Sequence, residues 1–495
     1  DWGNLGIIND GTPNSSANDV VGAVAEISRK NQQFNSDLFL TWKRQLSDKL
    51  DLSATVGHNI NARNANLFVS QVTNLVIPDY FSLSNTTVTP VTRRVISQRR
   101  LVGVYGSVSL GFDRWLYLSL GGRNDRSSTL PIENNSYFSP SASVSAVLSD
   151  AFTMPSKINY LKLRAGYART GNDADPYQVL PVFIAGQSRA GGFGSVLFPF
   201  GGVNAYELSN NAGNKNLRPE LTSEVEFGVE TKLFMNRLGL DLTYFNRNTS
   251  DQIINLLVEA ASGYTNQTTN LGKVQNKGWE IALSGTPVRT RNFTWDLNWN
   301  YTKIDNEVLE LGHSDKTSIL LNSSYDIDLR AEVGKPLGAI YAPQEATDPN
   351  GNVIVNPVTG LPQLADDKEY MGSINPDFTM GFGTALSAFG LTLGADGDYR
   401  QGGVFYSYTA RLNYFVGNAW ETQYNDREPW IIPNSVVDAG DGTFVENTTP
   451  VSRADVFTYY GATDSWQNKH VLPKTFFKLR NLYLNYQLPT AFVRK

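Results

Sequence analysis

The stretch LTSEVEFGVETKLFMNRLGLDLTYFN, residues 221–246, alternates polar and apolar side chains on both sides of a short turn at 235–237. A period of two residues over this length predicts two extended strands joined as a hairpin, with one apolar and one polar face. Carboxylates occupy polar positions in the middle of these strands, among them Glu224, Glu226 and Asp241. We therefore expect lipid on the apolar face and water on the polar face, as in the wall of a transmembrane β-barrel.

The same alternation recurs along the chain, for example over 50–56, 102–110, 142–148 and 293–302. Counted in this way, the sequence predicts about 13 strands of an antiparallel sheet. Short turns alternate with long irregular stretches, which are 64–92, 171–215, 312–375 and 401–474. All short turns would then lie at one end of the sheet and all long loops at the other. This arrangement is typical of an outer-membrane barrel with short periplasmic turns and long extracellular loops.

Composition excludes several other classes of protein. No apolar run of about 18 residues occurs, which excludes transmembrane helices but not membrane-spanning strands. The net charge is −5 and no basic stripe is present, so we expect no nucleic-acid partner. The chain has no cysteine, which excludes disulfides, thiolate metal sites and cysteine nucleophiles.

Nothing in the sequence indicates an enzyme. The histidines, His58, His313 and His470, are scattered, and no zinc-type histidine pair, nucleophile elbow or phosphate loop occurs. We therefore expect no catalytic residues, no metal site and no cofactor. The stretch 348–352 has part of the spacing of a calcium loop but lacks its sixth-position Gly and its closing Glu, so a Pro-Asn-Gly turn is favoured.

Candidate ligand contacts are aromatic residues of two long loops and polar residues of the strands. Planar side chains in a wet cavity can stack on sugar rings or apolar peptide side chains; the alternative is that they pack the loops together or against a partner. The loop aromatics are Phe193, Phe198, Tyr206, Tyr408, Tyr414, Trp420 and Trp430. The residues expected to face the lumen are Glu224, Glu226, Asp241, Asp296, Asn298 and Asp398. Those expected to face lipid are Phe227, Leu240, Trp295, Leu297 and Leu393.

Four motifs resemble those of the SusC/RagA group of TonB-dependent outer-membrane transporters. They are GYARTGN at 166–172, NLRPE at 216–220, GKVQNKGWE at 272–280, and FKLRNL at 477–482 followed by LP at 488–489. The motifs occur in the order of that group and span most of the chain. The resemblance implies uptake of a nutrient, an oligosaccharide or a peptide, across the bacterial outer membrane. It also implies two partners, a SusD-like surface lipoprotein lid and the TonB complex, which pulls on a plug inside the barrel.

The resemblance also implies parts that the sequence does not display. A plug domain, a TonB box and the final C-terminal strands are not visible, and a plugged transporter barrel would have about 22 strands. We therefore expect residues 1–495 to be part of a single barrel domain, with edge strands near 38–40 and 482–488. Another TonB-dependent receptor, a passive porin and, more distantly, a soluble β-rich carbohydrate-binding protein are the alternatives. The ligand is left open between glycan, peptide and metal chelate.

Overall fold

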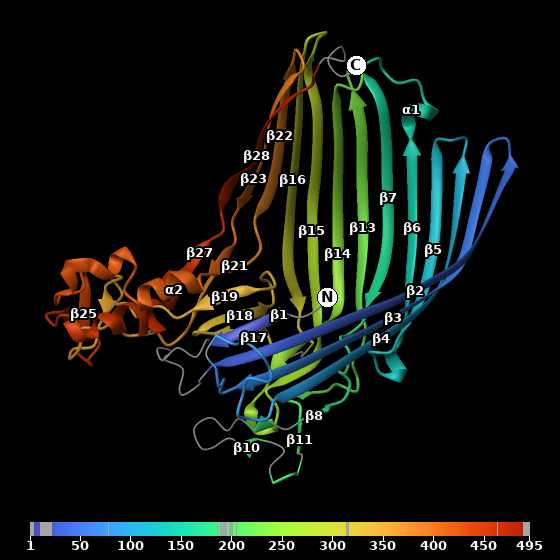
Figure 1. Cartoon of the computed structure of the whole chain (residues 1–495). Helices are drawn as coiled ribbons and strands as arrows, with labels where there is room; N and C mark the ends of the chain where they lie inside the picture. Colours follow the sequence, from blue (N-terminus) through green and yellow to red (C-terminus); the bar gives the residue numbers. More distant parts are fainter. Residues whose placement is uncertain are drawn as a thin grey trace.

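A large antiparallel sheet organises the chain in the computed structural model. The structure describes residues 4–9, 22–77, 79–185, 187–188, 196–197, 201–203, 205–312, 316–462 and 464–488. Within them, the long strands follow the order β2-β3-β4-β5-β6-β7-β13-β14-β15-β16-β22-β23-β28, with the short β1 (Asn4–Asn9) beside β2 and β12 (Asn211–Ala212) beside β15. Figure 1 shows these strands side by side in a curved wall, with β2, β3 and β4 running obliquely at one side.

Over the described residues, thirteen strands of this sheet are long, which confirms the expected number of about 13. Their bounds are β2 (Ala23–Ser47), β3 (Leu50–Thr73), β4 (Val91–Phe112), β5 (Leu116–Ser127), β6 (Ser136–Val147), β7 (Ile158–Asn172), β13 (Glu220–Leu233), β14 (Leu238–Leu257), β15 (Asn266–Arg289), β16 (Phe293–Glu310), β22 (Phe378–Ala388), β23 (Leu391–Gln401) and β28 (Phe476–Tyr486). The helix α1 (Leu148–Ala151) lies between β6 and β7. None of the helices in the described ranges has the length and apolar character needed to cross a membrane.

The pairing register shows which residues of neighbouring strands lie on the same face of the sheet. On β13, Gly228 lies opposite Arg164 of β7 and Thr243 of β14. Paired residues point to the same side of a sheet and successive residues to opposite sides, so the pairings assign every strand residue to one face. The six residues expected to face the lumen share one face, which we call the inner face, and the five expected to face lipid share the other, the outward face.

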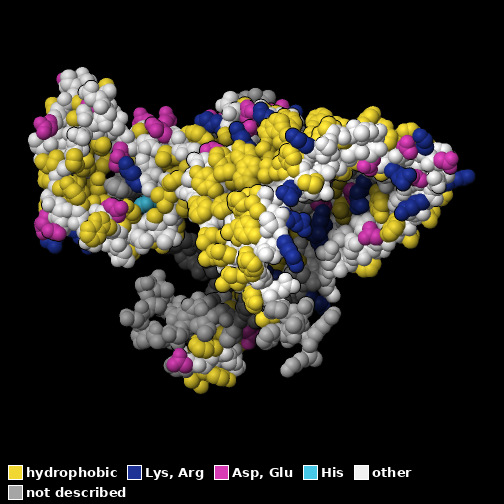
Figure 2. All heavy atoms as spheres, turned by 90° about the horizontal axis from the view of Figure 1, so that it is seen from above, with side chains coloured by type: hydrophobic (Ala, Val, Ile, Leu, Met, Phe, Trp, Pro, Cys, Tyr) yellow, Lys and Arg dark blue, Asp and Glu magenta, His cyan; other side chains and the backbone are white. Residues whose placement is uncertain are grey.

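The two faces differ in chemistry. Seen from above in Figure 2, hydrophobic side chains gather over a broad area of the wall, whereas Lys and Arg side chains gather in the hollow beside it. Large apolar side chains of the outward face are exposed, for example Phe227 at 53% and Leu393 at 47%. Exposed apolar residues on this scale indicate a surface that meets something other than water.

The structure corrects one expected strand end and agrees with the expected edges of the sheet. The strand β3 continues to Thr73, so the expectation that a loop begins at residue 64 is wrong. Asn64 and Asn66 stay in the ladder between β2 and β4, and apolar residues such as Leu67 and Val69 follow in the same strand. The expected edges agree with the structure, because β1 pairs with β2 only over Ala23–Ile27, and residues 34–47 of β2 pair with β3 alone among the described strands.

The connections after β16 and β23 build a loop domain, which has small cores of its own and shares another with the ends of β14, β15 and β16, where Ile319 and Ala331 pack with Val308. One sheet contains β17 (Ser318–Ser324), β18 (Ile327–Glu332), β19 (Ala339–Ala342) and β21 (Glu369–Ser373). Further short strands are β20 (Val353–Ile354), β25 (Ser435–Asp438), β26 (Phe444–Glu446), β24 (Val404–Tyr406) and β27 (Val471–Pro473). The main helices are α2 (Tyr408–Phe415), η3 (Trp420–Arg427) and η6 (Asp464–His470). Figure 1 places β17, β18, β19 and β21 beside the lower ends of the wall strands, and α2 and β25 further out to one side.

Candidate functional site

The centre of the inner face is an arginine that joins three strands. The guanidinium of Arg164 on β7 lies 2.8 Å from Asp241 Oδ1 on β14 and 3.3 Å from Glu226 Oε1 on β13. It also donates a hydrogen bond to Thr243 Oγ1. The side chain crosses β13 at Gly228, where a Cβ atom would lie 2.4 Å from the guanidinium carbon. Two of the predicted inner carboxylates are thus held by one cation that the sequence analysis did not single out.

The other predicted inner residues lie further along the same face. Glu224 pairs with Arg247, and Asp398 pairs with Arg480. Asp296 accepts a hydrogen bond of 2.7 Å from Thr286 Oγ1. Asn298 lies opposite Gly383 of β22. The inner face is therefore a ladder of polar side chains whose charges are largely paired, which suits contact with water or a polar ligand.

A second polar cluster lies where β7 ends. The carboxylate of Asp173 is buried and accepts hydrogen bonds from Arg99 Nε at 2.8 Å and Thr129 Oγ1 at 3.1 Å, and another from Ser127. Burial alone would raise the pKa of Asp173, but these hydrogen bonds and the charge of Arg99 outweigh it and lower the pKa. Asp173 directly follows the GYARTGN motif. The motif was the only signal in the sequence that could have pointed to it.

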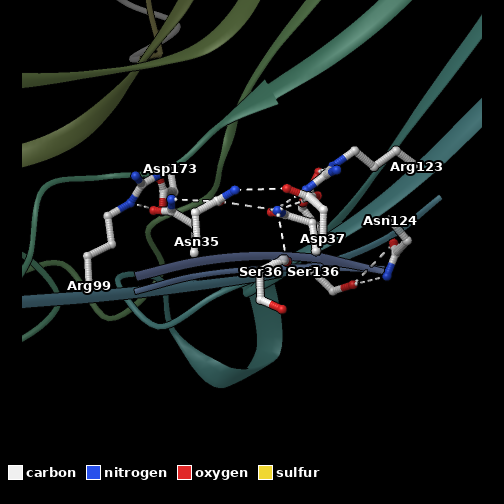
Figure 3. Close-up of polar contacts among 11 residues, drawn as sticks. Asn35, Ser36, Asp37, Arg99, Arg123, Asn124, Ser136 and Asp173 are labelled. Atoms are coloured by element: carbon white, nitrogen blue, oxygen red, sulfur yellow. Dashed lines mark hydrogen bonds and ion pairs between the residues drawn. The ribbon is translucent and has the colours of Figure 1, made fainter. Parts of the chain in front are cut away.

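Amide side chains extend this polar surface over β2 and β3. Asn59 Nδ2 donates to Asp37 Oδ1 at 2.7 Å, and Asn61 Nδ2 donates to Asn35 Oδ1 at 3.1 Å. Figure 3 shows Asn35, Asp37 and Arg99 on one side of the strands, with Ser36 pointing the other way. A hollow of about 490 Å³ adjoins them, and its lining includes Asn31, Gln33, Arg63, Arg99 and Asp175. Such a lining offers both donors and acceptors to hydroxyl or peptide groups.

The aromatic candidates fall into two classes of environment. Trp430 is 8% exposed and packs with Val355, Ile432 and Val451 in a core of the loop domain. Tyr414 packs against the same core, and burial is the main cause that raises its pKa to about 12. By contrast Trp420 is 80% exposed, Tyr206 69% and Tyr408 44%. The candidates Phe193 and Phe198 lie outside the described residues.

One exposed aromatic surface combines a predicted residue with two that the sequence analysis missed. The rings of Tyr325 and Tyr408 stack with centroids 5.1 Å apart, and their hydroxyl oxygens are 3.1 Å apart. The guanidinium of Arg411 lies 4.3 Å from the centroid of Tyr325. Stacked rings and a cation at the surface of a loop domain can contact planar or polar ligand groups. Tyr408 and Arg411 lie on the same helix, but Tyr325 is 83 positions from Tyr408, so no local pattern indicates the cluster.

The described residues contain no group of three or more side chains suited to hold a metal ion. His470 is buried against the rings of Tyr406 and Tyr414, where burial lowers its pKa. The stretch 348–352 is a turn in which Asp348 Oδ1 accepts hydrogen bonds from the backbone N–H groups of Asn350 and Asn352. The carboxylate of Asp348 is therefore engaged by the turn itself.

The chain matches one protein family and is similar to several known receptors. The model of the family described as "TonB dependent receptor-like, beta-barrel" matches residues 4–482. TonB-dependent receptor P26 of Formosa agariphila is 24% identical over 445 residues, covering 83% of this chain and 44% of the relative. TonB-dependent receptor SusC of Bacteroides thetaiotaomicron is 28% identical over 206 residues, covering 40% of this chain and 20% of the relative.

A solved structure shares the fold. The RagAB peptide transporter aligns with a TM-score of 0.75 and 19% identity, over 96% of this chain and 51% of that chain. The chain thus spans about half the length of this structure, and 44% of the length of receptor P26. At 19% identity this match shows that the two chains share a fold.

Proposed function

The chain belongs to the TonB dependent receptor-like β-barrel family and therefore lies in the bacterial outer membrane, and from this premise we propose that it serves TonB-dependent uptake of a nutrient. In this proposal a SusD-like surface lipoprotein covers the loop domain and the long-loop end of the wall. The ligand, an oligosaccharide or a peptide, passes along the inner face. Energy reaches the barrel from the TonB complex and not from a reaction on this chain.

The observation that carries the proposal is the contrast between the two faces of one continuous wall. The outward face is apolar and exposed, and the inner face carries the network of Arg164, Glu226 and Asp241. A charge on the lipid side of a barrel costs about 2–4 kcal/mol near the midplane for Lys or Arg, so the polar face belongs to the lumen. A lumen with this polarity supports passage of a hydrophilic ligand.

Three features support a peptide or an oligosaccharide as ligand. The solved structure with the same fold is described as a peptide transporter. The hollow beside Arg63 and Asp175 has amide groups in its lining, and these can bond either peptide groups or sugar hydroxyls. The exposed rings of Tyr325 and Tyr408 add a surface on which a sugar ring or an apolar side chain could stack.

An uptake experiment with the full-length protein tests the proposal. Cells of the source bacterium with and without the gene are given a set of labelled oligosaccharides and a set of labelled peptides, with and without a protonophore. We expect uptake of one set to require the gene and to stop when the protonophore collapses the energy supply of TonB. Uptake that requires the gene but survives the protonophore would identify a passive porin and contradict the proposal. Affinity purification from the same cells should recover the surface lipoprotein.

A further inference from the structure

Three arginines lie on the outward face. Arg126 and Arg169 are near the long-loop ends of β5 and β7, and Arg100 lies within β4, at the level where the neighbouring β5 ends. Arg100, Arg126 and Arg169 directly follow the inward-facing residues Arg99, Asp125 and Ala168, so alternation turns them outward. Arg100 and Arg126 are exposed and Arg169 is half-buried. We call these three residues the outer arginine cluster.

The cluster lies at the border of the apolar band. On the same face, the next outward residue of β4 toward the short turns is Val102, and that of β7 is Tyr167. Val102 is 40% exposed and Tyr167 is 42% exposed, as expected of side chains that meet lipid. The long-loop end of the strands is the extracellular end of this family's barrels. The cluster is therefore placed at the level where the headgroups of the outer leaflet begin.

The positive charges of the cluster have no partner of opposite charge in the wall. The outward positions of β4, β5, β6 and β7 contain no Asp or Glu. Among the residues that the structure describes, no carboxylate pairs with Arg100, Arg126 or Arg169. Arg169 donates two hydrogen bonds to the backbone oxygen of Phe138, at 2.9 and 3.3 Å. The inner arginines differ, because Arg99, Arg123 and Arg164 each pair with a carboxylate.

The spacing places two of these charges close together. Val102 is opposite Arg126 in the register of β4 and β5, so Arg100 and Arg126 are diagonal neighbours. Diagonal neighbours lie roughly 7–8 Å apart, within reach of long side chains. Like charges on neighbouring positions of a sheet repel one another, and an anion between them relieves the repulsion. A phosphate accepts bidentate hydrogen bonds from guanidinium groups and carries the opposite charge.

We propose that the outer arginine cluster binds the phosphate groups of phosphorylated glycolipid in the outer leaflet. The apolar band below the cluster would contact the acyl chains, and the arginines would hold the headgroup, which anchors the wall at a fixed depth. Basic residues beside a membrane interface attract anionic headgroups in this way. The proposal rests on the outer-membrane location of the chain and is independent of which nutrient is transported.

Lipid co-purification tests the proposal. The full-length protein is purified in mild detergent from its own outer membrane, and the phosphorylated glycolipid bound per protein is measured by mass spectrometry. The variant Arg100→Gln/Arg126→Gln/Arg169→Gln is compared with Arg29→Gln/Arg63→Gln/Arg93→Gln, which removes three arginines from the inner face of neighbouring strands. We expect a fall of about tenfold or more in bound glycolipid for the outer variant only. Equal retention by the outer variant, or an equal loss in the inner variant, would overturn the proposal.

Two further arms separate the source of the phosphate and guard against misfolding. Delipidated wild type should rebind the extracted glycolipid but not the same glycolipid after phosphatase treatment, and buffered inorganic phosphate should not displace it. Displacement by inorganic phosphate would show a site for the free ion and contradict the lipid assignment. The variant Arg100→Lys/Arg126→Lys/Arg169→Lys keeps the charge and should retain most of the glycolipid. If this variant loses the glycolipid and its barrel is unfolded, the loss of glycolipid in the Gln variant is due to misfolding, and the proposed contact is rejected.

Discussion

Arg164 of β7 and Asp241 of β14 form an ion pair, 2.8 Å between Nη2 and Oδ1, although β13 lies between their strands. The guanidinium reaches across β13 because Gly228 has no side chain there. The pair therefore ties three strands together on the inner face, with Glu226 of the middle strand as a second acceptor. A missing side chain on one strand is what makes a polar contact between its two neighbours possible.

We predict that Gly228→Ala weakens this three-strand contact. The added Cβ would lie 2.4 Å from Arg164 Nε and 2.7 Å from Arg164 Cγ, so the side chain must move away from Asp241. We expect a loss of about 1–3 kcal/mol in the free energy of unfolding, measured by urea titration of the full-length protein in lipid vesicles. The matched control is Gly166→Ala on the same face, where the nearest atom would be at 3.8 Å. Equal stability of the two variants would show that the contact contributes nothing.

A second prediction concerns Asp173 and the segment that follows β7. Asp173→Asn removes the charge that balances Arg99 and leaves the guanidinium without its carboxylate. Because Asp173 is buried, we expect a loss on the order of 3 kcal/mol and faster proteolysis of the adjoining loop. The control is Asp175→Asn, since Asp175 is exposed. If both variants are cut at the rate of the wild type, the cluster does not hold the loop.

The loop domain should lose stability in acid through Asp328. Burial alone would raise the pKa of Asp328, but hydrogen bonds from Arg330, Lys368 and Ser323 lower it below the ordinary value of 3.8. A carboxyl with a lowered pKa in the folded state stabilises above its unfolded pKa, and this contribution is lost as the pH falls through the folded value. We therefore expect the stability of the domain to decline as the pH drops below about 4.

Hydrogen exchange of residues 316–375 at a series of pH values measures this decline. In Asp328→Asn, the pH dependence between 5 and the acid limit should be shallower than in the wild type, because the titrating group is gone. The control is Asp367→Asn, since Asp367 is exposed. If the pH dependence of exchange in Asp328→Asn equals that of the wild type, Asp328 is not the cause of the loss of stability in acid.

The strands and their faces could be predicted because lipid and water impose a local pattern. Val225, Phe227 and Glu226 are assigned by their own order in the sequence, and the register agrees with that assignment. The pattern is less regular after Asn64, where apolar residues no longer fall on one face alone, although β3 extends to Thr73. There the backbone ladder continues, and apolar side chains such as Leu67 and Phe68 lie on both faces beside Asn64 and Asn66.

The contacts that form the sites could not be predicted, because their partners are distant in the sequence. Arg99 and Asp173 are separated by 74 positions, and Tyr325 and Tyr408 by 83. The loop domain collects its core from separate segments, with Val355, Trp430 and Val451 in one cluster. Aromatic content alone indicated that this loop matters, but it could not separate core residues from surface residues.

The chain offers a direct test of its faces because it contains no cysteine. We predict that a cysteine at Leu297 reacts with a lipid-soluble maleimide, whereas a cysteine at Asn298 reacts with a water-soluble one, in the full-length protein in vesicles. The two positions are adjacent on β16 and point to opposite faces, so each serves as the control for the other. Reaction of Asn298→Cys from the lipid phase would reverse the assignment of the faces.

The last prediction separates two tryptophans of the loop domain. Trp430 is 8% exposed and belongs to a core with Val355 and Val451, whereas Trp420 is 80% exposed. Truncation of a buried tryptophan costs about 3–5 kcal/mol, so Trp430→Ala should destabilise the loop domain in a hydrogen-exchange measurement. Trp420→Ala should leave exchange unchanged, because a surface substitution usually changes stability by less than about 0.5 kcal/mol.

If the exposed ring contacts the nutrient or the lid, Trp420→Ala should reduce nutrient uptake or recovery of the lipoprotein at unchanged stability. Unchanged uptake and unchanged recovery in Trp420→Ala would remove it from the binding candidates, and wild-type exchange in Trp430→Ala would contradict its place in the core.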